Sequence, residues 1–175
     1  MTVQRVYLRG PRKEDAEELV AAMTADRSFH RPWSSPPDTR EAYANWLGRN
    51  SGEGSAAYLI CRREDRAIAG TAVLGHIIYG ALRSAYLGYD GVPAFGGRGY
   101  MTEGLLLVLR RGFRSLRLHR IEANVQPGND RSRRLLERCG FTREGYSRRY
   151  LRIGGRWRDH ERWALLSEDF RSPWP

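Results

Sequence analysis

Apolar and polar residues repeat with two different periods along the chain, and these periods predict both helices and strands. Spacings of three and four residues, typical of helices buried on one side, occur in residues 13–23, 39–49, 100–116 and 130–139. Alternating or continuous apolar runs typical of strands occur in residues 3–8, 56–62, 67–79, 84–90, 120–125, 142–153 and 156–166. We therefore expect an α+β fold with about four helices and one sheet of about six or seven strands.

The segments between these elements contain residues that interrupt regular structure. Residues 29–37 include three prolines, which remove backbone donors and fix φ, so we expect a loop there. A serine and glycine cluster at residues 51–55 is a second loop, and Gly154-Gly155 marks the turn between the last two strands. The chain has 175 residues and no repeat, linker or low-complexity segment, so we expect residues 1–175 to form a single domain.

The composition limits which binding partners and which cellular compartment we expect. The formal net charge is +10, and Lys13 is the only lysine, so arginine carries nearly all of the positive charge. These arginines are spread along the sequence, which weakens a nucleic-acid interpretation and leaves open a ribonucleoprotein substrate or a polyanionic cofactor. The sequence has no stretch of about 18 apolar residues and no apolar leader, so we expect a cytoplasmic protein without membrane contact. The two cysteines, Cys61 and Cys139, lie far apart in apolar segments, and we expect buried thiols and no metal site.

A glycine-rich loop precedes the longest predicted helix. Its glycines are Gly96, Gly97 and Gly99, and the lack of Cβ atoms lets the backbone approach a ligand closely. Free N–H groups at the positive end of the helix dipole suit a phosphate or pyrophosphate, to which Thr102 can add a hydroxyl. The loop lacks the Lys-Ser/Thr pair of a Walker loop, and it lies too far along the chain for a Rossmann fingerprint. The residues therefore indicate an anion site of another kind, or a plain turn before a helix.

This loop resembles the first signature of the GCN5-related N-acetyltransferase (GNAT) superfamily, Arg/Gln-x-x-Gly-x-Gly/Ala. Gly99 matches the signature glycine, whereas Gly96 and Met101 depart from the signature at its two ends. The resemblance implies a mixed, mostly antiparallel sheet that is splayed at the cofactor cleft, with acetyl-CoA as the acetyl donor. In that family a bulged strand before the loop offers N–H groups to the thioester carbonyl. Here those positions are Leu87, Gly88 and Tyr89, and Gly88 suits a bulge.

A second segment resembles the second GNAT signature, Asn-x-x-Ser-x-x-Leu-x-x-x-x-Gly-Phe. It runs from Asn129 through Ser132 to Gly140-Phe141. Asn129 is suited to cap a helix, and Ser132 lies on the same helix face three positions later. Capping and solvation alone would also explain this pair. Together the two resemblances imply cofactor contacts from Leu87, Gly88, Tyr89, Gly96, Gly97, Arg98, Gly99, Tyr100, Met101, Thr102, Asn129 and Ser132.

Further segments resemble one branch of this superfamily, the RimJ/RimL ribosomal-protein acetyltransferases, and they are most similar to the RimJ type. They are Phe29-His30-Arg31-Pro32-Trp33, Tyr86-Leu87-Gly88-Tyr89, Leu118-His119-Arg120-Ile121 and the segment from Glu144 to His160. The resemblance extends over nearly the whole chain. It implies acetyl transfer to an α-amino group, that of an N-terminal alanine, serine or threonine of a ribosomal or other protein.

The chemistry of this superfamily limits the catalytic roles. An amine attacks the thioester directly, so the site needs a proton acceptor for the amine, donors for the oxyanion and an acid for the thiolate. The resemblance assigns the last role to Ser132, while Glu122 and Glu103 are candidates for the base. Surface ion pairs for both carboxylates, or a water chain without a single base, remain open. We expect Phe29, Trp33 and Tyr89 to line the acceptor side, although Phe29 and Trp33 could equally be packing residues.

Two other functions compete with N-terminal acetylation. The first keeps the chemistry and changes the acceptor to a small amine, such as a polyamine, an antibiotic or an amino-acid derivative. The basic composition argues mildly against polycationic acceptors, since they favour acidic clefts. The second is a CoA-binding protein without turnover that associates with the ribosome. We expect a protein or peptide N-terminus as partner and no nucleic-acid contact beyond such an association, and both monomer and homodimer remain open.

Overall fold

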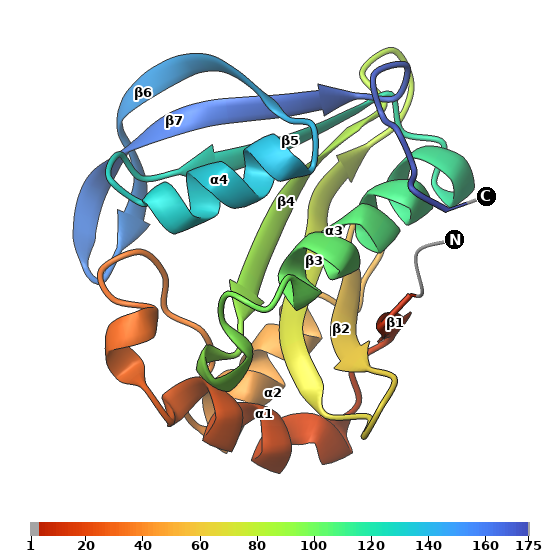
Figure 1. The fold of residues 1–175 in the computed structure, drawn as a ribbon. Coiled ribbons are helices and arrows are strands. Elements are labelled where there is room, and N and C mark those ends of the chain that lie inside the picture. The colour runs from red at the N-terminus through yellow and green to blue at the C-terminus, as the bar shows by residue number, and fades with distance from the viewer. Residues whose placement is uncertain (1–3, 175) are drawn as a thin grey trace.

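One twisted sheet of seven strands organises the protein in the computed structural model, which describes residues 4–174 (Figure 1). The strand order across the sheet is β1-β2-β3-β4-β5-β7-β6. Within residues 4–174 only β4 and β5 pair in parallel, and every other neighbouring pair is antiparallel. The strands are β1 (Val6–Arg9), β2 (Ala56–Arg62), β3 (Ile68–Ile78), β4 (Ser84–Gly91), β5 (Arg120–Val125), β6 (Thr142–Ile153) and β7 (Arg156–Leu166).

Four α-helices cover the sheet from both sides. They are α1 (Ala16–Thr24), α2 (Arg40–Arg49), α3 (Tyr100–Arg110) and α4 (Asp130–Arg138). The helices α3 and α4 pack on one face with the larger core cluster, and α1 and α2 pack on the other face under β2 and β3. The α+β fold with one mixed sheet is therefore confirmed, and its arrangement agrees with the one that the family resemblance implied.

Strand alternation sends neighbouring residues into the two different cores. In β2, Ile60 lies in the cluster beneath α3, while Leu59 and Cys61 lie in the cluster beneath α1 and α2. The expected burial of the two thiols is confirmed, because Cys61 and Cys139 are both buried and unpaired. Gly104 explains how α3 comes close to the sheet, since a Cβ there would lie 2.5 Å from the side chain of Ile60.

The sheet opens between β4 and β5. These strands pair only from Ser84–Arg120 to Tyr86–Glu122, after which they diverge. Beyond that point β4 continues to pair with β3 as far as Gly91, and β5 continues to pair with β7 as far as Val125. Each strand thus keeps its outer neighbour while its inner edge becomes free, which is the splay that the family resemblance implied.

A bulge at Gly88 was expected, and this expectation is wrong. The pairing of β3 with β4 is regular across Gly88, which lies opposite Val73. The register shift falls between Gly75 and Ile78, where His76 has a φ of 51°. The inner edge of β4 is therefore freed by the divergence of β5, and no extra residue in β4 is needed.

The observed boundaries lie close to the expected ones. The last helical turn of residues 100–116 is wound more widely, since α3 ends at Arg110 and continues as a π-helical turn, Arg111–Ser115. The first strand begins at Val6, and residue 3, which we included in it, lies outside the described residues. Within residues 4–174 no helix combines the length and the apolar character needed to cross a membrane.

Candidate active site

The glycine loop, defined as Gly96–Gly99, leads from the end of β4 into α3 and leaves a row of donors free. Gly97 and Gly99 have φ values of 73° and 83°, which glycine adopts without strain. The first intrahelical bond of α3 runs from the Glu103 N–H to the Gly99 carbonyl. In the described part of the chain, the N–H groups of residues 97–102 donate to no protein acceptor. Six successive free donors at a helix N-terminus are an arrangement that suits a phosphate-bearing ligand.

Both departures from the first GNAT signature have a local structural explanation. A Cβ at Gly96 would lie 3.0 Å from the ring of Phe29, so the ring occupies the space of a side chain at that position. Met101 points toward the sheet, where its sulfur would lie 2.3 Å from a Cβ at Gly70 and its Cγ 3.2 Å from one at Gly91. Two glycines in β3 and β4 thus accommodate the larger residue, and the free backbone donors of the loop are unaffected.

The other predicted cofactor residues of this segment differ in their orientation. Tyr100 is half-buried, and its ring contacts the Arg5 and Arg62 guanidinium groups at 4.9 and 5.3 Å. Thr102 accepts a hydrogen bond from Arg138 of α4 at 3.3 Å, so its hydroxyl lies between the two helices. Arg98 is exposed in the loop itself. Of these side chains, Arg98 and Thr102 are available to a ligand between α3 and α4. The Tyr100 ring instead packs against Arg5 and Arg62.

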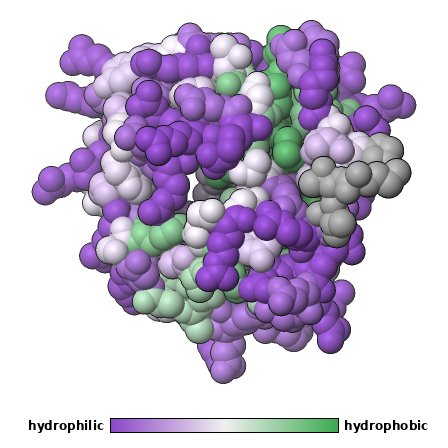
Figure 2. Space-filling view, viewed as in Figure 1, coloured by the Kyte–Doolittle hydropathy of each residue, from purple (hydrophilic) through white to green (hydrophobic). Residues whose placement is uncertain are grey.

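The start of α4 lies across the gap from the end of β4. The Asn129 side chain caps the helix by accepting a hydrogen bond from the Ser132 N–H at 3.2 Å. The Ser132 hydroxyl lies 2.5 Å from the hydroxyl of Tyr89 on β4. We call Tyr89 and Ser132 the hydroxyl pair. Figure 2 shows a hollow beside α4, on the side of the glycine loop, and the hydroxyl pair connects the two elements that border it.

Burial fixes the protonation state of this pair. Removal from water raises the pKa of the Tyr89 phenol above its usual value of about 10, and the contact with Ser132 opposes this rise only in part. Tyr89 therefore remains a neutral phenol well above physiological pH. It has a proton to donate, and Ser132 is close enough to pass on that proton or to hold the phenol in place.

The opposite face of the gap carries a carboxylate and an amide. Ile121, Ala123 and Val125 of β5 face the core beneath α3 and α4, so Glu122 and Asn124 face the other side of the sheet. Glu122 forms a 2.8 Å ion pair with Arg120 and lies beside Tyr86 at the point where the strands part. Among residues 4–174, the Asn124 Oδ1 is buried without a hydrogen-bond donor.

The structure does not bring Glu103 to the gap. Its carboxylate accepts from the Arg5 backbone N–H at 2.9 Å and from the Arg5 guanidinium at 2.5 Å, and α3 contacts β1 there. Of the two carboxylates considered for the base, only Glu122 lies at the mouth of the gap. Leu87 and Gly88 lie on β4 along its free edge, in the stretch where β5 has diverged.

The proline loop, residues 29–37, closes the far end of the gap. The Gln126 amide donates to the carbonyls of Trp33 and Pro32 at 2.9 and 3.3 Å, which attaches the loop to the end of β5. On the other side, Ser34 donates to Asp90 of β4 at 2.6 Å. The loop thus connects the two diverging strands, and it limits how far the gap extends.

Phe29 and Trp33 are both half-buried at this closure. Phe29 lies against the glycine loop, with the Arg131 guanidinium 4.0 Å above its ring. Trp33 packs against Gly128, where a Cβ would meet its ring at 3.6 Å. Both residues therefore border the gap through packing contacts that hold the loops in place.

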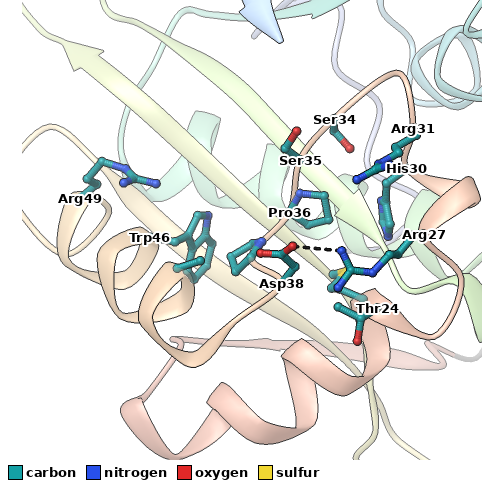
Figure 3. Close-up of a pocket in the computed structure, with 13 residues that line it drawn as sticks. Thr24, Arg27, His30, Arg31, Ser34, Ser35, Pro36, Asp38, Trp46 and Arg49 are labelled. Atoms are coloured by element: carbon teal, nitrogen blue, oxygen red, sulfur yellow. Dashed lines mark hydrogen bonds and ion pairs between the residues drawn. The ribbon is translucent and has the colours of Figure 1, made fainter. Parts of the chain in front are cut away.

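A cavity of about 240 Å³ lies behind the proline loop, between the end of α1 and α2 (Figure 3). Trp46 and Arg49 of α2 face it from one side, and Arg27 and His30 from the other. His30 is buried, and its Nδ1 lies 3.8 Å from Asp90. Burial lowers the pKa of His30 and raises the pKa of Asp90. The cavity is lined by neither the hydroxyl pair nor Glu122, so it is separate from the gap between β4 and β5.

The splayed sheet, the free donors of the glycine loop and the hydroxyl pair define an acyl-CoA-binding transferase fold. A model of the "Acetyltransferase (GNAT) domain" matches residues 5–142, and this chain belongs to the GNAT acetyltransferase family. It is an N-acetyltransferase of that family, a class that uses acetyl-CoA as donor.

Two relatives resemble the chain over nearly its whole length. The "[Ribosomal protein uS5]-alanine N-acetyltransferase" of Escherichia coli is 34% identical over 178 residues, covering 97% of this chain and 92% of that protein. The "Probable N-acetyltransferase YjcK" of Bacillus subtilis is 35% identical over 172 residues, covering 94% and 95%. The resemblance to the RimJ type is thereby confirmed.

Solved structures agree with this relationship. Mycobacterium smegmatis RimJ in complex with CoA-disulfide superposes with a TM-score of 0.85 at 32% identity, covering 93% of this chain and 82% of that one. A spermidine N-acetyltransferase of Vibrio cholerae in complex with CoA and spermine has a TM-score of 0.80 at 21% identity, covering 95% of this chain and 98% of that one, and so shares the fold.

Sequence reasoning missed several residues of the site. Asn124 shares a strand face with Glu122, and this alternation could have indicated it. Gln126, Ser34 and Asp90 join segments 56 to 94 residues apart in the chain, and no local pattern predicts such contacts.

Proposed function

We propose that this protein transfers an acetyl group from acetyl-CoA to the α-amino group of a protein N-terminus that begins with alanine, serine or threonine. The observation that supports it most is the gap between β4 and β5, which has a proton donor on one face and a carboxylate on the other. Tyr89 and Ser132 lie on the α4 side, and Glu122 lies on the opposite side. Attack of an amine on a thioester needs a base for the proton of the amine and an acid for the departing thiolate.

The donor end of this reaction rests on the glycine loop. Residues 97–102 offer free N–H groups that can bind a diphosphate, with Arg98 nearby to add positive charge. Bound acetyl-CoA would supply the thioester whose acetyl carbon is transferred. Beyond Tyr86 the free edge of β4 runs along Leu87, Gly88 and Tyr89, and the residues there whose N–H groups point away from β3 can donate to the oxyanion.

The hydroxyl pair would protonate the departing thiolate. Because Tyr89 is a neutral phenol whose hydroxyl lies 2.5 Å from Ser132, a proton given by one member can be replaced from the other. Either order delivers one proton to sulfur as the carbon–sulfur bond breaks. The Asn129 cap holds the backbone of Ser132, which limits the movement of the serine hydroxyl.

The acceptor amine would enter from the face that carries Glu122 and Asn124. Glu122 accepts the proton that the ammonium must lose before its nitrogen forms the new bond to carbon. The unpaired Asn124 Oδ1 can accept a hydrogen bond from the same nitrogen, which would orient its lone pair. Arg120 holds Glu122 in position through their ion pair.

The choice of acceptor rests on the full-length resemblance to an alanine N-acetyltransferase that acts on ribosomal protein uS5. A panel of acceptors tests it: peptides that begin with Ala, Ser or Thr, the same peptides with a blocked N-terminus, polyamines and aminoglycosides. We expect CoA thiol release with the free peptides only, and mass spectrometry should place the acetyl group on the first residue. Release with polyamines and not with peptides would contradict the proposed acceptor. CoA binding without release for any acceptor would contradict the enzymatic role.

The cellular acceptor can be tested separately by intact-mass spectra of ribosomal proteins from a strain that lacks this protein. A protein lighter by one acetyl group in that strain identifies the acceptor. An unchanged spectrum would redirect the search to acceptors outside the ribosome.

A further inference from the structure

The β6–β7 hairpin extends well beyond the sheet that supports it. The last pair between β5 and β7 is Val125–Glu161, and Tyr146 of β6 lies opposite Glu161. Residues 147–160, which we call the distal hairpin, therefore have no support from β5. The turn at Gly154-Gly155 lies about 20 Å beyond Glu161, at about 3.3 Å per residue. Figure 1 shows this hairpin at the edge of the molecule.

Positive charge is concentrated on the distal hairpin. It carries five arginines and one carboxylate, Asp159. Within the described residues, none of their guanidinium groups lies within 4.0 Å of a carboxylate oxygen. The five arginines lie within eleven consecutive residues of the sequence, and the fold places them on one projection. They are Arg148, Arg149, Arg152, Arg156 and Arg158, and all but the last are exposed.

The single carboxylate of the distal hairpin is used to hold its shape. Asp159 accepts from the Tyr146 hydroxyl at 2.5 Å and from the Arg149 backbone N–H at 2.7 Å. These contacts lie at the register shift between Ser147 and Leu151, where Arg149 has a φ of 47°. Asp159 thus fixes the bulge, and the arginine side chains around it are left to contact other molecules.

An exposed tryptophan lies among these arginines. Trp157 is 63% exposed, the highest value among the large hydrophobic residues, and its cross-strand partner Arg152 lies on the same face of the hairpin, whereas Arg156 and Arg158 point to the other face. A solvent-exposed indole beside an exposed cation has the composition of a surface that stacks on nucleobases while arginines bind the backbone. Figure 2 shows hydrophilic side chains projecting from the side of the molecule where the hairpin lies.

We propose that the distal hairpin binds RNA, with its arginines on backbone phosphates and Trp157 stacked on an unpaired base. The guanidinium binds phosphate and carboxylate oxygens alike, so the exposed Trp157, which can stack on an unpaired base, is what favours a nucleic acid over an acidic peptide. A second copy of this chain is disfavoured, because a symmetric contact would place the unpaired arginines of two hairpins against each other. The choice of RNA over single-stranded DNA rests on the proposed function, because a ribosomal acceptor would be presented beside RNA.

The position of the distal hairpin agrees with this role. Its base adjoins Glu161, which pairs with Val125. The residue after Val125, Gln126, holds the proline loop through the Trp33 carbonyl. RNA bound to the hairpin would therefore lie next to the closed end of the gap. The hairpin would hold a ribonucleoprotein acceptor beside the site without contacting the reacting atoms.

Two variants with equal charge loss test the proposal by fluorescence anisotropy. The probe is a labelled RNA of about 20 nucleotides with a stem and an unpaired loop, titrated between about 50 and 200 mM KCl. The hairpin variant is Arg148→Gln, Arg149→Gln, Arg152→Gln and Arg156→Gln. The control carries Arg66→Gln, Arg111→Gln, Arg114→Gln and Arg117→Gln, at arginines that are also exposed and have no carboxylate within 4.0 Å.

We expect the hairpin variant to bind at least about tenfold more weakly and its log–log salt slope to fall by roughly 3, since about four phosphate contacts are lost. The control should change affinity by less than about threefold. Trp157→Ala should weaken binding of the RNA with the unpaired loop about tenfold, and it should leave the affinity for a fully paired duplex unchanged. Equal losses in the two arginine variants, or equal competition by polyglutamate and RNA, would overturn the proposal. So would a Trp157→Ala variant that converts a dimer to a monomer and binds RNA normally.

The outcomes separate this proposal from the proposed function. Acetylation of a short free peptide requires no RNA, so the hairpin variant should keep the wild-type kcat with that acceptor. If the peptide is acetylated and RNA binding does not depend on the hairpin, only the inference fails. If RNA binding depends on the hairpin and no peptide is acetylated, only the proposed function fails.

Discussion

The hydroxyl pair permits a test in which two substitutions must not act independently. Tyr89→Phe removes one oxygen and keeps the half-buried ring, and Ser132→Ala removes the other oxygen and keeps the helix start. If the pair protonates the leaving thiolate as one unit, either change breaks the same 2.5 Å contact and the same proton path. We therefore expect the double variant to be about as impaired as the worse single variant.

The expected loss in kcat follows from the negative charge that develops on the thioester sulfur. A hydrogen bond to a charged group contributes about 1.5–3 kcal/mol, which corresponds to a loss of roughly 10- to 150-fold in kcat for each single variant. Independent action would multiply the losses to roughly 10²- to 10⁴-fold in the double variant. The interaction free energy of the double-mutant cycle should therefore be about 1.5–3 kcal/mol.

The assay is CoA thiol release at saturating acetyl-CoA, with a peptide acceptor and with the melting temperature of each variant as a folding control. Multiplicative losses would refute the paired role. So would an increase in the KM for acetyl-CoA with kcat unchanged, because this would assign the pair to ground-state binding. Since burial holds the pKa of Tyr89 above its usual value, kcat of the wild type should show no decline from this phenol between about pH 6 and 9.

Three further predictions test other parts of the site. Gly97→Ala, at φ 73°, should raise the KM for acetyl-CoA roughly 5- to 30-fold in the thiol-release assay, because a Cβ strains the loop by about 1–2 kcal/mol. The control Gly80→Ala, at φ 70° in a distant turn, should leave this KM unchanged. Glu122→Gln should lower kcat/KM about 10²-fold near neutral pH, and by less at alkaline pH, where more of the amine is already neutral. Glu103→Gln should lower the melting temperature and leave kcat within about twofold of the wild type. The reverse pattern would assign the role of the base to Glu103. Burial lowers the pKa of His30, so below pH 6.5 the unfolded chain binds a proton at this residue that the folded chain does not bind. The free energy of unfolding should therefore fall as pH decreases, and His30 should contribute at most about 1.4 kcal/mol per pH unit to this fall. Urea unfolding from about pH 7 to 5 should show a shallower decline in His30→Gln, and an unchanged slope would contradict the assignment.

The sequence by itself determined the elements and the chemistry of the donor site. The hydrophobic periods specify each helix and strand because burial on one side requires them, and the positions of the glycines predict where the backbone turns and where donors stay free. The backbone turn at Gly96–Gly99, whose geometry suits a phosphate, and the cap at Asn129 are local properties. They depend on residues a few positions apart, and such properties can be read from a chain without its fold.

The tertiary structure determined which residues of these elements contact one another and which strand edges remain free. Glu122 and Glu103 are both carboxylates in amphipathic segments, and only the fold shows that Arg5 binds Glu103 while Glu122 remains at the gap. The free edge of β4 comes from the divergence of β5, a property of two strands together, and a bulge at Gly88 was the wrong local explanation.

The same holds for the hydroxyl pair. The five arginines of the distal hairpin, by contrast, lie within residues 148–158 of the sequence, and the fold adds that they extend beyond the support of β5. Tyr89 and Ser132 are 43 positions apart, and their contact exists only because α4 returns across the gap from β4. Contacts of this kind depend on long-range packing, which no period or spacing in the sequence encodes.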